Sequence, residues 1–154
     1  MGTPKALLVV DNQTLLAHHL RLFEAARAVA LVTGVHHTPI LDALADGAFA
    51  APADLRVVRN PSPERGQISS VRVGLDALLG LALPALVLPI DVPPLTGLDL
   101  APLLDAVCSP EGASAAIASH GGRDGHPVAL SAAALSDVAR LPDDVPLRDW
   151  ITGL

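Results

Sequence analysis

Short apolar runs alternate with segments of helical periodicity along most of this chain. We expect helices at 15–23, 38–45, 67–79, 98–107, 132–140 and 147–151, and strands at 6–10, 29–32, 55–58, 84–90, 115–118 and 127–130. Strands that alternate with helices are typical of right-handed crossover connections, which place helices on a mostly parallel sheet. The pattern therefore predicts one α/β domain over residues 1–154, a three-layer sandwich with a mostly parallel sheet.

The composition agrees with buried parallel strands and excludes several classes of protein. Hydrophobic residues make up 51% of the 154 positions, but aromatic residues are limited to Phe23, Phe49 and Trp150, so the core is aliphatic. A net charge of −6 without a basic stripe argues against a nucleic-acid partner. Cys108 is the only cysteine, and neither a signal peptide nor a membrane span is visible. These features predict a cytoplasmic protein without a membrane partner.

The segment 60–75, NPSPERGQISSVRVGL, is the most informative stretch of the chain. A turn-rich loop follows the strand at 55–58 and ends at Gly66, where a helix begins with Gln67. Unpaired N–H groups at a helix start carry partial positive charge and suit a nucleotide or another anion. The alternative is an ordinary loop in which Ser69 or Ser70 caps the helix.

Three further positions are chemical candidates. Asp91 ends the apolar strand at 84–90 and could hold Mg²⁺ through its carboxylate or simply organise the turn before Pro93. Lys5 could neutralise phosphate charge or be a solvated side chain. His126, between Gly125 and Pro127, could donate a hydrogen bond to a ligand or lie in a turn without a special role.

Asp143 and Asp144 precede the last predicted helix, and we expect one of them to cap it. No His/Cys cluster has zinc-site spacing, and Ser69 and Ser70 lack the glycines of a nucleophile elbow.

Taken together, four ordered segments resemble the molybdenum cofactor nucleotidyltransferases and related small nucleotidyltransferase domains. The start MGTPKALL resembles the end of that family's nucleotide loop, and NPSPERGQISSVRVGL resembles its second motif. LPIDVP resembles its metal-binding segment and GRDGHPV its acceptor segment. The resemblance covers nearly the whole chain and implies a Rossmann-like fold.

The resemblance also implies an activity and a set of site residues. Members move a nucleoside monophosphate from CTP or GTP to a phosphorylated, molybdopterin-type acceptor and release pyrophosphate. It implies catalytic roles for Lys5 and Asp91, with Mg²⁺ on Asp91, and an acceptor site at Gly125 and His126. The nucleotide would be bound by Gly2, Lys5, Asn60, Gly66, Gln67 and Ser69.

Met1 aligns with the methionine in the middle of the family's R-M-G segment. The resemblance therefore implies that the first, central strand and its glycine loop are missing from this sequence, either because the natural product is longer or because a shorter protein has lost them. Such a gap would leave unpaired backbone groups between the neighbouring strands. Three expectations therefore stay open: an enzyme, a non-catalytic nucleotide- or pterin-binding remnant, or a structural, dimerising protein. We expect a monomer or a homodimer.

Overall fold

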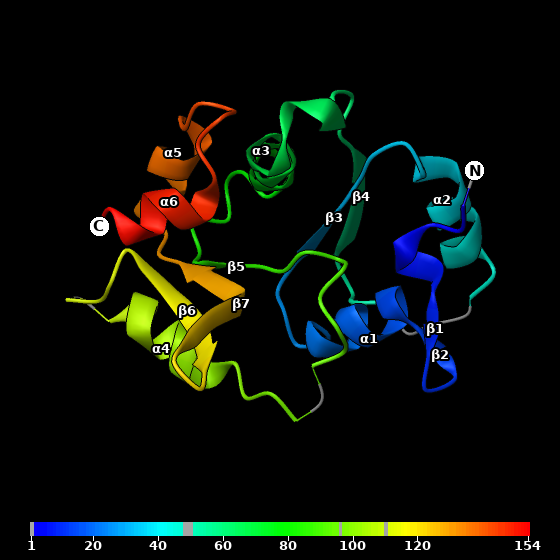
Figure 1. Ribbon diagram of the computed structural model, residues 1–154, viewed down its shortest axis with the longest axis horizontal. Helices are drawn as coiled ribbons and strands as arrows, with labels where there is room; N and C mark the ends of the chain where they lie inside the picture. The colour runs from blue at the N-terminus through cyan, green and yellow to red at the C-terminus, as the bar shows by residue number, and fades with distance from the viewer. Residues whose placement is uncertain (1, 48–50, 96, 110) are drawn as a thin grey trace.

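The computed structural model describes residues 2–47, 51–95, 97–109 and 111–154, so Met1 and Phe49 lie outside the described part of the chain. Helical and extended elements alternate as the sequence predicts (Figure 1). The helical elements are η1 (Lys5–Leu7), α1 (Leu15–Leu22), α2 (His37–Ala45), η2 (Pro63–Arg65), α3 (Gln67–Ala77), α4 (Ala101–Cys108), α5 (Ala134–Ala139) and α6 (Leu147–Thr152). The strands are β1 (Val9–Val10), β2 (Gln13–Thr14), β3 (Val29–Thr33), β4 (Leu55–Arg59), β5 (Ala85–Val87), β6 (Ala115–His120) and β7 (Arg123–Leu130).

The mixed α/β class is confirmed, but the prediction of one mostly parallel sheet is wrong. Within the described residues, β3 and β4 form a parallel pair, whereas β5, β7 and β6 form an antiparallel sheet in that order. The two-residue turn Gly121–Gly122, with φ of 57° and 74°, joins β6 to β7. A connection this short can join only antiparallel strands, so the local turn sets the direction of β7.

The strand predicted at 6–10 is also largely wrong. Lys5–Leu7 is a 3₁₀ turn, and only Val9 and Val10 are extended. Asp11 and Asn12 take positive φ and reverse the chain, so β1 pairs with β2 instead of entering a larger sheet. The expected cap of the next helix is confirmed, because the Thr14 hydroxyl accepts a hydrogen bond from the N–H of Ala17 at 3.1 Å.

The buried side chains form two hydrophobic clusters, one in each half of the molecule. The first combines β7 with α3, α5 and α6, through Ile68, Val128, Leu130, Val138 and Leu147. The second combines η1, α1 and α2, through Ala6, Leu16, Leu20 and Ile40, with Val29, Leu31, Leu55 and Ile90 packed against it. The division between the clusters follows the division between the β3–β4 and β5–β7–β6 sheets.

Helix α3 connects the two halves and lies between them in Figure 1. Its side chains Val71 and Leu75 pack on the first cluster, which also includes Val87 of β5. On its other side Gly74 lets the helix approach β3, because a Cβ atom there would lie 3.1 Å from Cγ2 of Val32. Helix α3 is thus packed against both sheets.

Candidate functional site

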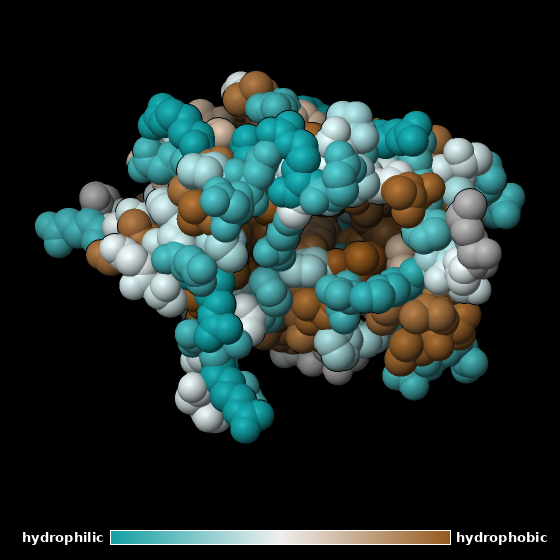
Figure 2. Space-filling model, turned by 45° about the horizontal axis from the view of Figure 1, so that its top comes forward, coloured by the Kyte–Doolittle hydropathy of each residue, from teal (hydrophilic) through white to brown (hydrophobic). Residues whose placement is uncertain are grey.

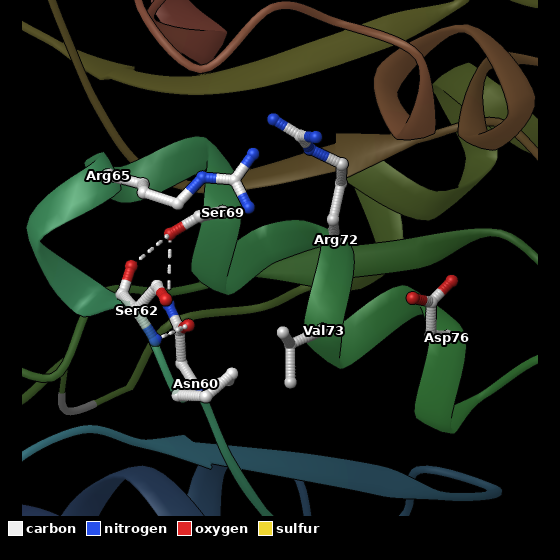
Figure 3. Close-up of a pocket in the computed structure, with 8 residues that line it drawn as sticks. Asn60, Ser62, Arg65, Ser69, Arg72, Val73 and Asp76 are labelled. Atoms are coloured by element: carbon white, nitrogen blue, oxygen red, sulfur yellow. Dashed lines mark hydrogen bonds between the residues drawn. The ribbon is translucent and has the colours of Figure 1, made fainter.

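The loop before α3 is organised by the side chain of Asn60. The backbone N–H of Asn60 donates to Thr33 O at 2.7 Å, which extends the β3–β4 pairing by one residue. The buried carboxamide accepts from the N–H of Ser62 and donates to the hydroxyl of Ser69, each at 2.9 Å (Figure 3). It also donates to the hydroxyl of Ser70 at 2.9 Å. Asn60 therefore ties the end of β4 to the first turn of α3.

The start of α3 carries no side-chain cap. Gly66 precedes the helix with φ 96°, and the Ser69 hydroxyl donates back to Gly66 O at 2.7 Å. The expectation that Ser69 or Ser70 caps this helix is therefore wrong, because their hydroxyls bond to Gly66 O and to Asn60 rather than to the first N–H groups. No side chain therefore caps the first N–H groups of α3, and such groups carry partial positive charge.

Lys5 and Asp91 come together although they are far apart in the chain. The Nζ of Lys5 in η1 lies 3.2 Å from Oδ2 of Asp91, which stands four residues after the end of β5. Both side chains are more than half exposed, so the pair is open to a ligand. The nearby backbone is anchored because Nε2 of buried His19 lies 3.1 Å from Val92 O.

The start of α3 and the segment that contains His126 meet at a cavity of about 340 Å³. Gln67 lines it together with Gly125 and His126 of β7, so a predicted nucleotide residue shares this space with both predicted acceptor residues. Helix α6 contributes Arg148. The apolar part of the lining is formed by Ile117, Val128, Pro146, Leu147 and Ile151.

Within this cavity, burial favours the neutral form of His126. Burial lowers the pKa of His126 from its ordinary value, and the negative charge of Asp91 partly opposes that shift. The Nδ1 atom of His126 is buried and has no hydrogen-bond partner among the described residues. Lys5 and Asp91 do not line this cavity, and their link to it is the influence of the Asp91 charge on the pKa of His126.

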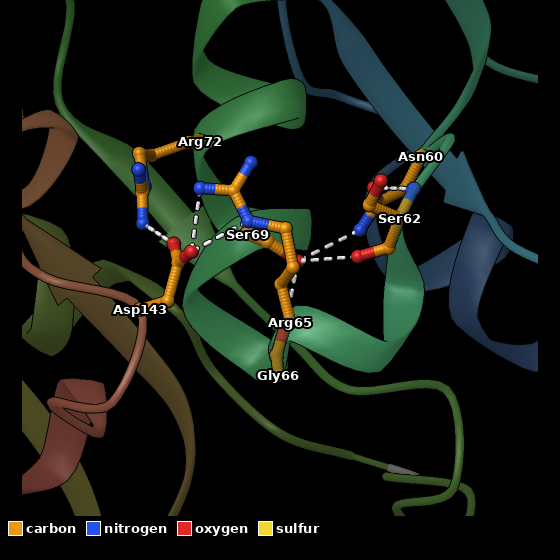
Figure 4. Close-up of polar contacts among 7 residues, drawn as sticks. All are labelled: Asn60, Ser62, Arg65, Gly66, Ser69, Arg72 and Asp143. Carbon is orange, nitrogen blue, oxygen red and sulfur yellow. Dashed lines mark hydrogen bonds and ion pairs between the residues drawn. The ribbon is translucent and has the colours of Figure 1, made fainter.

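A cluster of charged residues holds the chain before α6 against α3. The carboxylate of Asp143 binds Arg65 with an Nε–Oδ2 distance of 2.6 Å, and it also forms an ion pair with Arg72 (Figure 4). The expectation that Asp143 or Asp144 caps the last helix is wrong, because α6 begins after Pro146 without a side-chain cap. The two arginines were not predicted as site residues, although both stand inside the loop motif 60–75.

A smaller cavity of about 210 Å³ lies next to the Asn60 loop (Figure 3). Its polar lining is provided by Asn60, Ser62, Arg65, Ser69, Arg72 and Asp76. Asn60 and Ser69 are thus at the wall of a cavity, but their side chains are already hydrogen-bonded within the loop. Gly2 has no heavy atom within 4 Å of the position that a Cβ would take.

Within the four described ranges, no three His, Cys, Asp or Glu side chains come together as a metal site. A single exposed carboxylate such as Asp91 nevertheless fits Mg²⁺, which is held by one or two carboxylates together with substrate phosphates and water.

None of the described helices has the length and apolar character needed to cross a membrane.

The profile of the MobA-like NTP transferase domain matches residues 1–154, and the chain belongs to this family. Among solved structures, the chain is similar to the crystal structure of Rv0371c from Mycobacterium tuberculosis H37Rv, with a TM-score of 0.65 and 24% sequence identity. The match covers 94% of this chain and 71% of that chain, and it supports the fold. No curated protein matches the chain.

Proposed function

We propose that this protein transfers a nucleoside monophosphate from CTP or GTP to the phosphate of a molybdopterin-type acceptor, with release of pyrophosphate. Membership of the MobA-like NTP transferase family supports nucleotide transfer as the reaction class. The observation that carries the proposal is the pairing of Lys5 with Asp91 at 3.2 Å, within electrostatic range of the cavity that contains Gln67 and His126. A triphosphate is bound by a cation, by a carboxylate that can hold Mg²⁺, and by the N–H groups at a helix start.

In this mechanism an oxygen of the acceptor phosphate attacks the α-phosphorus of the nucleotide. The new bond joins that oxygen to the α-phosphorus, while the bond to the bridging oxygen of the pyrophosphate breaks and its electrons leave with pyrophosphate. Lys5 would stabilise the charge that develops on the leaving group. Asp91 would hold Mg²⁺, which supplies further positive charge to the phosphates when it is bound.

The cavity between α3, β7 and α6 would bind the acceptor. Gly125 leaves the backbone accessible, and neutral His126 can donate one hydrogen bond while its other nitrogen accepts. Gln67 at the start of α3 would lie between the nucleotide and the acceptor, and the N–H groups after Gly66 would face the nucleotide phosphates. Asn60 and Ser69 would support this binding by holding the loop in place rather than by direct contact.

The test is transfer of label from CTP or GTP, labelled at the α-phosphate, to molybdopterin in the presence of Mg²⁺. We expect label in the pterin product and one pyrophosphate per transfer, and we expect Asp91→Ala to lose transfer while keeping its circular dichroism spectrum. Asp137→Ala is the matched control, because Asp137 is also an exposed carboxylate paired with a cation, Arg140. Full activity of Asp91→Ala would remove Asp91 from the reaction.

Nucleotide or pterin binding without transfer is the second candidate function. The separation of β3–β4 from β5–β7–β6 favours it, because groups held on two separate sheets are less firmly positioned for reaction. This function predicts saturable binding of CTP or GTP without pyrophosphate release. Size-exclusion chromatography with light scattering would distinguish the monomer from the homodimer in the same preparation.

A further inference from the structure

The smaller cavity, of about 210 Å³, is lined mainly by polar side chains that already have partners within the protein. Asn60 donates to Ser69, and Asp143 binds both Arg65 and Arg72. A ligand could use these groups only by breaking contacts that hold the loop before α3 and the chain before α6 in place. This cavity therefore offers a ligand few unused binding groups.

The larger cavity, of about 340 Å³, is lined by charged groups without a partner. Asp124 of β7 and Arg148 of α6 both line it, and the ion pairs among the described residues include neither of them. The Nδ1 atom of His126 is buried and likewise has no partner in the part of the chain that the structure describes. A carboxylate, a guanidinium group and an imidazole nitrogen can thus all bind a ligand here without losing another contact.

The rest of this lining is apolar and indicates what kind of ligand fits. Ile117 and Val128 come from adjacent strands, and Leu147 and Ile151 come from α6. Val128 and Leu147 are almost fully buried and belong to the first hydrophobic cluster, so the apolar wall of the cavity is part of the core. Apolar walls with a few polar groups are typical of sites for small organic molecules. Figure 2 shows that hydrophobic and hydrophilic residues also alternate around the hollow near the middle of the molecule.

An irregularity in the β6–β7 pairing lies beside these groups. The register shifts between Ile117 and Ser119, so one residue of β6 there lies opposite three residues of β7. His126 is the middle one of the three, and Asp124 directly precedes them. Extra residues of this kind bend a strand and redirect its side chains, and they are frequent next to active sites. The irregular pairing thus coincides with the polar part of the cavity lining.

We propose that Asp124 and Arg148 determine which acceptor this cavity takes, by binding two different parts of one molecule. Asp124 accepts hydrogen bonds from adjacent N–H groups on the edge of a flat heterocycle, such as the 2-amino-4-oxo edge of a pterin. Arg148 donates to the phosphate of the same molecule, and the ring lies against the apolar wall. The inference rests on the proposed function, because it takes this cavity as the acceptor site.

The assignment of the two groups follows from their chemistry. An ionised carboxylate only accepts hydrogen bonds, so Asp124 matches a ring edge that carries two neighbouring donors. A guanidinium group only donates, and its planar geometry matches a phosphate. A ring with a carbonyl oxygen in place of the amino group would direct an acceptor at the carboxylate. The cavity should therefore distinguish a 2-amino ring from a 2-oxo ring.

Direct binding tests the role of Asp124 without any nucleotide. Titration calorimetry compares 6-hydroxymethylpterin with 6-hydroxymethyllumazine, in which a carbonyl oxygen replaces the 2-amino group. We expect the pterin to bind at least about tenfold more tightly, because the lumazine leaves the carboxylate facing an acceptor. Asp124→Asn should abolish or reverse this preference, since a carboxamide can donate to the carbonyl oxygen.

The matched control for Asp124 is Asp144→Asn, because Asp144 is also exposed but does not line the cavity. This variant should keep the preference for the pterin. An unchanged preference in Asp124→Asn would overturn the role of that carboxylate. Both Asp124 and Arg148 are exposed, so their variants should keep the circular dichroism spectrum of the parent protein.

The phosphate ester of 6-hydroxymethylpterin tests the role of Arg148. We expect the ester to bind at least about tenfold more tightly than the free alcohol, because a guanidinium–phosphate pair is a strong, charge-assisted interaction. Arg148→Gln should lose this gain. Arg21→Gln should keep it, since Arg21 is also an exposed cation but belongs to α1. An equal gain in Arg148→Gln and in the parent would contradict the proposal.

These titrations separate the inference from the transfer reaction. Selective binding of the pterin phosphate without transfer of label would contradict the proposed reaction and support the assignment of Asp124 and Arg148. Transfer to molybdopterin with an unchanged Michaelis constant for the acceptor in both variants would support the reaction and overturn the assignment. Absence of binding by all three compounds at millimolar concentrations would also overturn it.

Discussion

The Nζ of Lys5 lies 3.2 Å from Oδ2 of Asp91, although 86 positions separate the two residues in the sequence. The side chains are 67% and 55% exposed, so their pairing contributes little to stability. We therefore expect the role of this pair, which joins η1 to the chain after β5, to lie in ligand binding rather than in stability.

Lys5→Met tests this distinction between stability and activity. We expect the free energy of unfolding to change by less than about 1 kcal/mol, because the pair is exposed. The transfer rate should fall by about 100-fold, since one charge that stabilises the leaving pyrophosphate is lost. Urea denaturation and labelled-nucleotide turnover measure the two effects. Arg140→Met removes another exposed, paired cation and should leave both unchanged.

Asn60→Ala should destabilise the protein by about 1–3 kcal/mol, because the N–H of Ser62 loses its acceptor and the Ser69 and Ser70 hydroxyls lose a donor. Urea unfolding measures the loss. Ser62→Ala is the control, since Ser62 takes part through its backbone N–H and C=O. Equal stability of the two variants would contradict the structural role of Asn60.

Gly66→Ala should destabilise the protein by roughly 1–3 kcal/mol, because φ 96° with ψ 178° is strained for any residue with a Cβ. Thermal unfolding of Gly2→Ala provides the comparison, since no heavy atom lies within 4 Å of a Cβ at that position. A Gly66→Ala protein as stable as Gly2→Ala would show that the loop before α3 can adopt another conformation.

Asp143→Asn should cost about 1–3 kcal/mol, because Arg65 and Arg72 both lose the carboxylate that binds them. The neighbouring Asp144 is exposed, and Asp144→Asn should stay within about 0.5 kcal/mol of the parent. The difference between the variants should shrink at high salt, because ions screen the pairing. A difference that is independent of salt would argue against an electrostatic role.

The pH dependence of stability should reveal His19. Burial lowers the pKa of His19, its hydrogen bond to Val92 O opposes that shift, and the charge of His18 adds to it. As pH falls through about 6.5, the unfolded chain takes up a proton that the folded chain does not, so the free energy of unfolding decreases. Denaturation at about pH 7.5 and pH 5.5 should show that the free energy of unfolding decreases less in His19→Gln than in the parent protein. The pKa of His126 is also lowered, so part of the decrease in the free energy of unfolding should persist in His19→Gln.

The sequence alone determined the local elements and the family. Helical periodicity and turn residues placed α1, α2, α3 and α6 close to their observed bounds, and Thr14 caps α1 as predicted, because these features depend on neighbours within a few residues. The four motifs predicted the nucleotidyltransferase family, which the match over residues 1–154 confirms. Residue types also marked Lys5, Gln67, Asp91 and His126 as candidates before their positions in space were known.

Only the tertiary structure decided which residues meet. Strand direction depended on the Gly121–Gly122 turn and on pairing between distant segments, which periodicity does not encode. The pairing of Asp143 with Arg65 and Arg72 depends on how α6 approaches α3, so helix-capping rules predicted a different role for that carboxylate. The same physical reason applies to β3, because the backbone groups of a strand hydrogen-bond only to other segments, and among the described strands β3 pairs with β4 alone.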